Sequence, residues 1–203
     1  MKILSHKLLI IALAITFVSP ITKVSWLPLA HAEPIPIPED LASMPADFTL
    51  QSSDGPVSLQ DFRGKVVLLF FGYTHCPDAC PSTLRNWALA FKRLEKENLE
   101  NVHGLFVSVD PERDTPETLK DYTSYFHPNI SGVTGDHEIL SFITMFYRAN
   151  YDADPPDENG EYAVNHNGLV YVIGPNSKVR DLLSFQSQPD EFSQSILNVL
   201  KEN

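Results

Sequence analysis

Two runs of apolar residues indicate that buried strands form the centre of the fold. Residues 65–73 are apolar at nearly every position, and residues 102–109 form a second, largely apolar run. A strand that is apolar on both sides has to be covered on both faces, which is typical of strands in a parallel sheet. The pattern therefore predicts a central sheet with a layer of structure on each face.

Between and after these runs, apolar residues recur at the three- and four-residue spacing of helices that bury one face. One such helix is expected over 81–97, and Thr115 followed by Pro116 is a typical start for the next. The apolar positions expected to mark the four helices are Leu84, Trp87, Ala88, Phe91 and Leu94 in the first, Leu119, Tyr122 and Phe126 in the second, Ile139, Phe142, Ile143 and Phe146 in the third, and Phe192, Ile196, Val199 and Leu200 in the last.

Shorter patterns complete the expected order of elements. Residues 46–50 alternate as a strand does, residues 58–62 suggest a helical turn, and the polar, proline-containing residues 152–160 suggest a loop. Strand character returns over 162–173, and a turn leads from there into a further strand over 179–185. This order predicts an α/β fold, with a mixed central sheet and helices on both faces.

The first residues have the layout of an export signal. Two lysines precede an apolar run over residues 8–18, and residues 30–32 read Ala-His-Ala, a small-x-small cleavage site. The run is shorter than the ~20 residues that span a bilayer. We therefore expect residues 1–32 to be a signal peptide or, if uncleaved, a membrane anchor. Either role implies export to the periplasm or to the outer face of the cytoplasmic membrane.

The composition changes again after this segment. Residues 33–44 carry alternating prolines and predict an extended tether without a core of its own. Residues 45–203 are enough for one domain with one sizeable core. The chain has 26 acidic and 15 basic residues, a net charge of −11, and no cluster of lysine and arginine. This balance argues against nucleic acid and anionic lipid as partners and suits a basic partner or a cationic ligand, although solubility alone would also explain it.

The chemistry of the chain centres on its only two cysteines. Cys76 and Cys80 are separated by three residues and lie where the buried strand at 65–73 hands over to a helix. A helix N-terminus favours thiolate over thiol, and a thiolate is both a redox nucleophile and a ligand for soft metals. A structural disulfide is the less useful alternative, because so short a loop constrains the unfolded chain little. Disulfide exchange and metal binding both remain open.

One histidine stands out beside the cysteines. His166 lies where a loop enters a late strand, among largely apolar positions. A lone histidine in such a place is more often a hydrogen-bonded structural residue than a ligand. Two cysteines and one histidine nevertheless form a soft, low-coordinate set that suits copper, and that could also hold zinc with one position open.

Longer motifs carry a resemblance to a known family. Residues 72–81 read GYTHCPDACP and residues 108–117 read SVDPERDTPE, and three shorter motifs, GVTG, VNH and VIGP, follow in order. The chain resembles the SCO/SenC family of copper-binding proteins over nearly the whole of its globular part. The resemblance implies a thioredoxin-like fold. It also implies copper, as Cu(I), Cu(II) or both, held by Cys76, Cys80 and His166.

The same resemblance implies a function and partners. Copper would pass to the dinuclear copper centre in a subunit of a cytochrome oxidase, so the protein would act as a metallochaperone. A thioredoxin-like reductant or another copper chaperone is a further expected partner. The family usually has aspartate before the histidine, whereas this chain has Asn165. The change removes an acidic group that could orient the histidine, but it removes no ligand.

Two enzymatic alternatives use the same cysteines. In a thiol–disulfide oxidoreductase, Cys76 and Cys80 would reduce the cysteines of the copper recipient. Against this, redox motifs of the fold usually have two residues between their cysteines, and they face a proline where this chain has Asn165 and His166. A peroxidase would need one activated cysteine beside an arginine, for which only Arg113 and Arg148 come into question. Whether the protein is an enzyme therefore stays open.

The remaining polar residues have simpler explanations. His75 could contact copper transiently but is better explained as an exposed loop residue, and Asp78 as a solvated or backbone-bonded one. The stretch from Asp110 to Asp114 is typical of a turn and helix start rather than of a catalytic pair. The other histidines, which we expect at the surface, are His103, His127 and His137.

Overall fold

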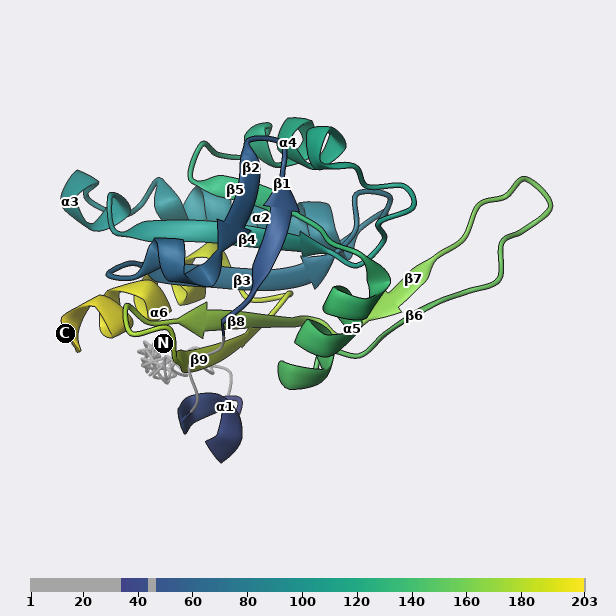
Figure 1. The fold of residues 1–203 in the computed structure, drawn as a ribbon. Coiled ribbons are helices and arrows are strands. Elements are labelled where there is room, and N and C mark those ends of the chain that lie inside the picture. The colour runs from purple at the N-terminus through teal and green to yellow at the C-terminus, as the bar shows by residue number, and fades with distance from the viewer. Residues whose placement is uncertain (1–33, 44–46, 203) are drawn as a thin grey trace, which may run out of the picture. The chain divides into compact units, whose positions relative to one another are not determined.

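The structure, a computed structural model, describes residues 34–43 and 47–202. Its centre is a five-stranded sheet with the order β5-β4-β3-β8-β9 (Figure 1). These strands are β3 (Val66–Gly72), β4 (Val102–Ser108), β5 (Ile130–Val133), β8 (Leu169–Ile173) and β9 (Val179–Ser184). The pairs β3–β4 and β4–β5 are parallel, whereas β8 is antiparallel to both β3 and β9. The predicted mixed sheet is confirmed.

Strand β3 shows why an unbroken apolar run was needed at the centre. All of its seven residues are buried. Val67, Leu69 and Phe71 belong to the core on one face, and the alternate residues Val66, Leu68 and Phe70 belong to the core on the other. Since successive side chains point to opposite faces, both faces need apolar residues, as the sequence pattern predicts.

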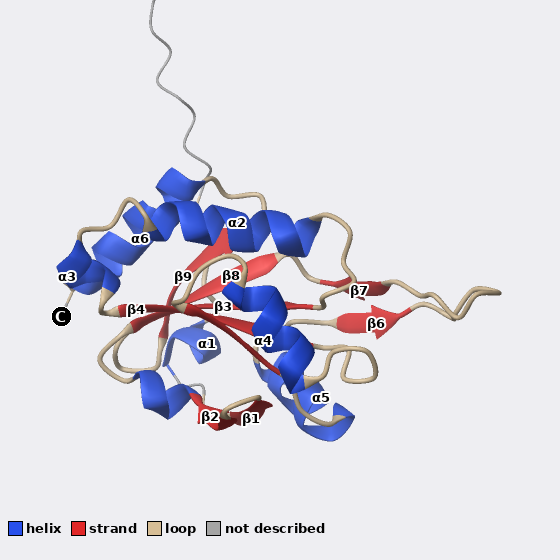
Figure 2. Cartoon of the chain, turned by 90° about the horizontal axis from the view of Figure 1, so that it is seen from above, coloured by secondary structure: helices blue, strands red, loops and turns tan. Residues whose placement is uncertain are grey.

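Different elements cover the two faces, as Figure 2 shows. Helices α2 (Ala79–Phe91) and α6 (Pro189–Lys201) lie on one face, and Trp87 and Phe192 pack edge to face between them at 6.4 Å. The other face carries the hairpin of β1 (Thr49–Ser52) and β2 (Gly55–Ser58) and the helix α5 (His137–Phe146). Helix α4 (Pro116–Ser124) packs beside β5, and a 3₁₀ helix, η1 (Leu59–Phe62), follows β2.

Capping residues set the starts of two helices near the sheet edge. Thr115 accepts a hydrogen bond from the backbone N–H of Thr118, with Pro116 in the first turn of α4, as predicted. Asp136 caps α5 in the same way through the N–H of Ile139. These caps fix where α4 begins after β4 and where α5 begins after β5.

The structure differs from the expected elements at several places. The helix expected over 81–97 ends at Phe91, and a short separate helix, α3 (Lys96–Leu99), follows it. Strands β2, β5 and β6 (Tyr151–Ala153) were not expected, and β6 includes the first residues of the loop predicted over 152–160. Phe142, an apolar residue of the helical stripe, is 59% exposed. The short strands and the single exposed residue were not predicted because so few positions carry too little pattern to be recognised without their neighbours.

The most consequential difference concerns residues 162–173. They form two strands rather than one: β7 (Val164–His166) ends before β8 begins. Strand β7 pairs with β6 (Tyr151–Ala153) in a separate antiparallel hairpin, which projects beyond the five-stranded sheet (Figure 1). The histidine at the end of β7 therefore belongs to the hairpin, not to the central sheet.

Part of the segment expected to be a tether packs against the domain. Within 33–44, a short helix, α1 (Glu39–Ser43), is formed, and Leu41 is only 2% exposed within the core. Ile35 and Ile37 pack against the same core. The expected signal peptide or anchor at 1–32 lies outside the described residues. Within the part of the chain that is described, no helix is long and apolar enough to cross a membrane.

This packing predicts a measurable effect on stability. Leu41→Ala should lower the free energy of unfolding by about 2–5 kcal/mol, since it removes a buried side chain and leaves a cavity. Glu39→Ala, an exposed change in the same helix, should have little effect. Urea unfolding of both variants checks this, and equal midpoints for Leu41→Ala and the wild type would show that the segment does not pack.

Candidate metal centre

The two cysteines lie at the junction between the end of β3 and the start of α2. Cys76 is in the connecting loop and is half-buried, whereas Cys80 is the second residue of α2 and is fully buried. The backbone N–H of Cys80 donates to the Sγ atom of Cys76 over 3.5 Å. The first N–H groups of a helix lack partners within it, so the sulfur of Cys76 satisfies one of them.

His166 joins the cysteines from a different element, the end of β7. Its Nε2 atom lies 3.7 Å from the Sγ atom of Cys80. The three ligand atoms of Cys76, Cys80 and His166 all lie within 4.8 Å of one another, and among the described residues no other three histidine, cysteine or acidic side chains form such a group. Residues 86 positions apart in the sequence are thus brought together as one set of donors.

Aromatic rings and a backbone carbonyl orient the imidazole of His166. Phe70 and Tyr73 contact the ring edge to face, at 5.5 and 6.1 Å between centroids. The Nδ1 atom lies 2.9 Å from the carbonyl oxygen of Asn167. A proton on Nδ1 donates to that carbonyl, which leaves the lone pair of Nε2 directed toward the sulfurs.

Asn165 does not take the place of an orienting aspartate. Its amide nitrogen donates instead to the Oδ1 atom of Asp154, 3.1 Å away across the β6–β7 hairpin. The backbone of Asn167 supplies the contact to the histidine ring, so the ring is held without an acidic neighbour at position 165. Sequence reasoning missed Asn167 and the aromatic contacts, because a backbone carbonyl and a ring edge leave no mark in a motif.

The surroundings of the two thiols shift their pKa values in opposite directions. Hydrogen bonding from the side chain and the backbone N–H of Cys80 to its sulfur lowers the pKa of Cys76 to about 3, despite partial burial. The neighbouring Cys76 sulfur and burial raise the pKa of Cys80 far above its ordinary value. The metal-free pair therefore consists of one thiolate and one thiol, and binding through both sulfurs must release the proton of Cys80.

A glycine makes room for the buried sulfur. A side-chain carbon at Gly72 would lie 2.6 Å from the Sγ atom of Cys80 and 2.7 Å from the ring of Phe106. Both distances are far below van der Waals contact. Glycine is therefore required at the end of β3 because the sulfur occupies the space of a side chain.

The other candidates lie outside the set of three. His75 is 47% exposed on its side chain and lies beside Asp114, with 3.8 Å between Nδ1 and Oδ1. Asp78 is exposed and accepts a hydrogen bond from the hydroxyl of Ser82 at 3.3 Å. Arg113 and Arg148 are paired with Asp110 and Asp40 respectively. Their carboxylate partners give no support to a peroxidase site.

The expectation of surface histidines was wrong for two of the three. His103 is half-buried on β4, stacks on Phe62 at 4.5 Å and lies 2.8 Å from the hydroxyl of Ser131. Burial lowers its pKa to about 4. His127 is also half-buried and packs edge to face on Phe91, whereas His137 is exposed, as expected, and pairs with Glu112.

Comparison with known proteins identifies the family. The SCO1/SenC family matches residues 38–201. The chain belongs to the SCO1/SenC family. The bovine mitochondrial SCO2 homolog is 39% identical over 152 residues, a match that covers 74% of this chain and 57% of the bovine protein. The chain thus spans little more than half the length of this curated relative.

Solved structures of the SCO1/SenC family support the same assignment. Copper-bound ScoI from Arabidopsis thaliana is 32% identical, with a TM-score of 0.70 over 77% of this chain and 98% of the other. BsSco, a member of the Sco family of cytochrome c oxidase assembly proteins in which a disulfide switch was identified, is 28% identical, with a TM-score of 0.59 over 77% and 93%. The predicted thioredoxin-like fold is confirmed by these neighbours.

The depressed pKa of Cys76 predicts an unusual reactivity. In the reduced protein, Cys76 should react with iodoacetamide at a rate that changes less than about twofold between pH 5 and 8, since it is a thiolate throughout. An ordinary thiol would slow about tenfold per pH unit below its pKa. Mass spectrometry of the alkylated protein checks this. Cys80→Ser should keep the flat profile, and a steep fall toward pH 5 would contradict the arrangement of the thiols.

The space taken by Cys80 predicts the effect of filling it. Gly72→Ala should lower the free energy of unfolding by about 1–3 kcal/mol, because the added methyl overlaps a sulfur and an aromatic ring. It should also weaken metal binding, since the sulfur has to move. Chemical denaturation and metal titration of the variant check both effects, and unchanged values would show that the end of β3 is less crowded than described.

Proposed function

We propose that this chain binds one copper ion through Cys76, Cys80 and His166 and delivers it to the dinuclear copper centre of a respiratory cytochrome oxidase. The observation that carries the proposal is the meeting of the three donor atoms within 4.8 Å, in a domain of the SCO1/SenC family. Copper is cargo in this function rather than a permanent cofactor.

The chemistry of the donors favours copper. Thiolates are soft ligands that suit Cu(I), and an imidazole nitrogen beside sulfur suits Cu(II). Zinc could use the same three donors, although its sites usually have a fourth ligand. The Arabidopsis ScoI structure contains copper, and BsSco belongs to a family of oxidase assembly proteins. Both facts support the same choice of metal and recipient for this chain.

The proposed place of action is outside the cytoplasm. Residues 1–32 would act as signal peptide or anchor, and the domain over 45–203 would face the periplasm or the outer surface of the cytoplasmic membrane. The proposed recipient is a copper-binding oxidase subunit. Copper would come from another copper chaperone, and a thioredoxin-like protein would keep the cysteines reduced.

A second function is favoured by the unequal thiols. The Cys76 thiolate could attack a disulfide of the recipient, forming a mixed disulfide and expelling one recipient thiolate. Cys80 would then lose its proton and attack the Cys76 sulfur. This step forms the Cys76–Cys80 disulfide and releases the second thiolate of the recipient. The recipient disulfide is thereby reduced by two electrons. The disulfide switch of BsSco supports this alternative.

Replacing His166 separates the two functions. His166→Ala should weaken Cu(II) binding by at least about tenfold, because a lost ligand bond is worth more than ~1.4 kcal/mol. Cu(I) binding should weaken less, since two sulfurs suffice for it. The Cys76–Cys80 redox couple should stay largely intact. Metal analysis and competition titrations with each ion check these outcomes, with His137→Ala, an exposed histidine, as the control.

Cells at limiting copper then discriminate between delivery and reduction. If delivery is the task, His166→Ala should fail to support oxidase assembly. If the reduction of a partner is the task, His166→Ala should support assembly and Cys76→Ala should not. Full assembly with His166→Ala would defeat the delivery function, and equal copper binding by the oxidised and reduced protein would rule out the site itself.

A further inference from the structure

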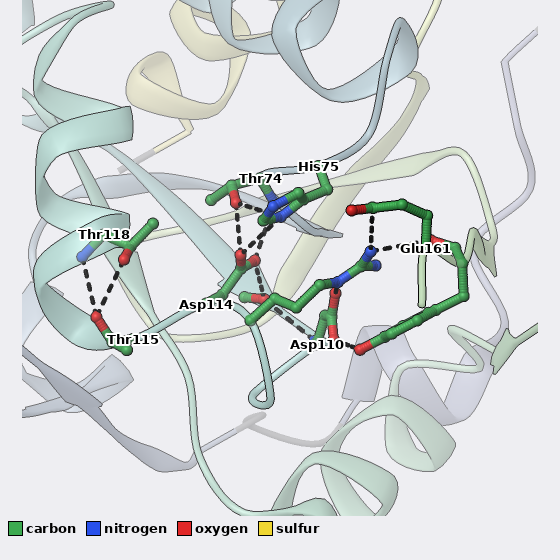
Figure 3. Close-up of polar contacts among 10 residues, drawn as sticks. Thr74, His75, Asp110, Asp114, Thr115, Thr118 and Glu161 are labelled. Atoms are coloured by element: carbon green, nitrogen blue, oxygen red, sulfur yellow. Dashed lines mark hydrogen bonds and ion pairs between the residues drawn. The ribbon is translucent and has the colours of Figure 1, made fainter. Parts of the chain in front are cut away.

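One turn contacts both halves of the ligand set. We call it the bracket turn. It follows β4 and includes Asp110, Arg113 and Asp114. From the sequence it was interpreted only as a turn and helix start. Figure 3 shows contacts on two sides of the turn, between Asp114 and the loop residues Thr74 and His75, and in the direction of Glu161, which precedes β7.

The first arm is Asp114, which holds the cysteine loop. Its Oδ2 atom accepts the backbone N–H of Thr74 at 2.9 Å, and its Oδ1 atom accepts the hydroxyl of Thr74 at 2.5 Å. The hydroxyl of Ser108, at the end of β4, donates to the same carboxylate at 2.5 Å. Thr74 is two residues before Cys76, so the loop is fixed to β4 immediately ahead of its first ligand.

The burial of this carboxylate makes the arm more than a surface contact. The side chain of Asp114 is 0% exposed. Within the described residues no lysine or arginine pairs with it, and the imidazole of His75, 3.8 Å from Oδ1, is a cation only when it is protonated. A buried carboxylate without a cationic partner is stable only if hydrogen bonds replace its water, and the three donors supply them. Movement of the loop away from β4 would remove two of these three hydrogen bonds, those from Thr74.

The second arm joins Asp110 and Arg113 to Tyr162, four residues before His166. Asp110 accepts a hydrogen bond from the Nε atom of Arg113 at 2.6 Å and another from the hydroxyl of Tyr162 at 2.7 Å. The guanidinium group lies over the Tyr162 ring, 3.6 Å from its centroid, and donates to the Tyr162 carbonyl at 3.0 Å. The side chain of Asp110 is 1% exposed.

The topology explains why two arms are needed. The cysteine loop leaves β3, which is fixed in the five-stranded sheet, but β7 pairs only with β6 in a separate hairpin. Backbone pairing within the central sheet therefore does not set the distance between the sulfurs and the imidazole. Strand β7 continues into β8 at its end, Val164 packs in the core, and Tyr162, just before the strand, is held by the bracket turn.

We propose that the bracket turn positions His166 relative to the cysteine pair and thereby sets the relative affinity of the site for Cu(II) and Cu(I). Cu(II) depends on a nitrogen donor at a fixed place beside the sulfurs, whereas Cu(I) is satisfied by the two sulfurs. The arm through Tyr162 should therefore affect Cu(II) selectively, and the arm through Asp114 should affect both ions. This inference rests on the copper site proposed above.

Tyr162→Phe tests the second arm, because it keeps the aromatic ring under Arg113 and removes only the hydroxyl that Asp110 binds. Tyr151→Phe is the matched control: it lies opposite His166 on the same hairpin, but its hydroxyl contacts Ser141. Tyr162→Phe should weaken Cu(II) binding about tenfold and shift the thiolate-to-Cu(II) absorption band, with Cu(I) affinity changed less than about twofold. Tyr151→Phe should leave both affinities unchanged.

Two further measurements test the first arm and the metal-free protein. Asp114→Asn and the milder Thr74→Val should lower both copper affinities, and they should change the alkylation rate of Cys76. In the apoprotein, the ring resonances of His166 in NMR spectra should shift in Tyr162→Phe and not in Tyr151→Phe. This readout needs no copper and reports the position of the ring directly.

Failure of the proposed copper site and failure of the positioning role of the bracket turn give different results. A wild-type protein that binds no copper defeats the proposed function. If the wild type binds copper and Tyr162→Phe lowers only the thermal stability, with an unchanged ratio of Cu(II) to Cu(I) affinity and unshifted His166 resonances, the turn is merely structural and the inference is overturned. Unchanged Cu(I) binding and Cys76 reactivity in Asp114→Asn and in Thr74→Val would overturn the first arm.

Discussion

The geometry of the site depends on β3 being buried on both faces of the sheet. Because cores on both sides hold this strand, its end is a fixed point from which the cysteine loop leaves and α2 begins. The glycine at that end lets the sulfur of Cys80 sit against the sheet. The helix N-terminus then supplies an N–H to the sulfur of Cys76. The reactivity of Cys76 in the loop thus depends on the packing of β3, several residues earlier in the chain.

The sequence was sufficient for the central sheet and for the cysteine pair. Long apolar runs, helical spacing and the cap at Thr115 each depend on local pattern, so they could be predicted. Cys76 and Cys80 stand out by their spacing at a strand–helix junction. His166 could be joined to them only through its apolar surroundings and the family resemblance, because nothing local shows that two segments 86 residues apart will meet.

What could not be predicted depends on tertiary contacts. The division between β7 and β8, which places His166 on a projecting hairpin, leaves only a weak signal in one continuous stretch of strand character. Asn165 was expected to weaken the orientation of the histidine, but the carbonyl of Asn167 provides the contact. Half-burial of His103 likewise follows from stacking on Phe62, which comes from an element far away in the sequence.

The two sulfurs of the site differ in their accessibility to an incoming ligand. Cys80 lies against the sheet with no exposed surface, whereas Cys76 is only partly covered and is flanked by the exposed residues His75 and Pro77. At the proposed copper site, an incoming ligand would reach the sulfur of Cys76 more readily than that of Cys80. Exchange with another protein would then replace ligands in sequence, with Cys76 displaced first and the buried sulfur last. In the copper-delivery function proposed above, the burial that positions the donors would therefore also favour one order of release.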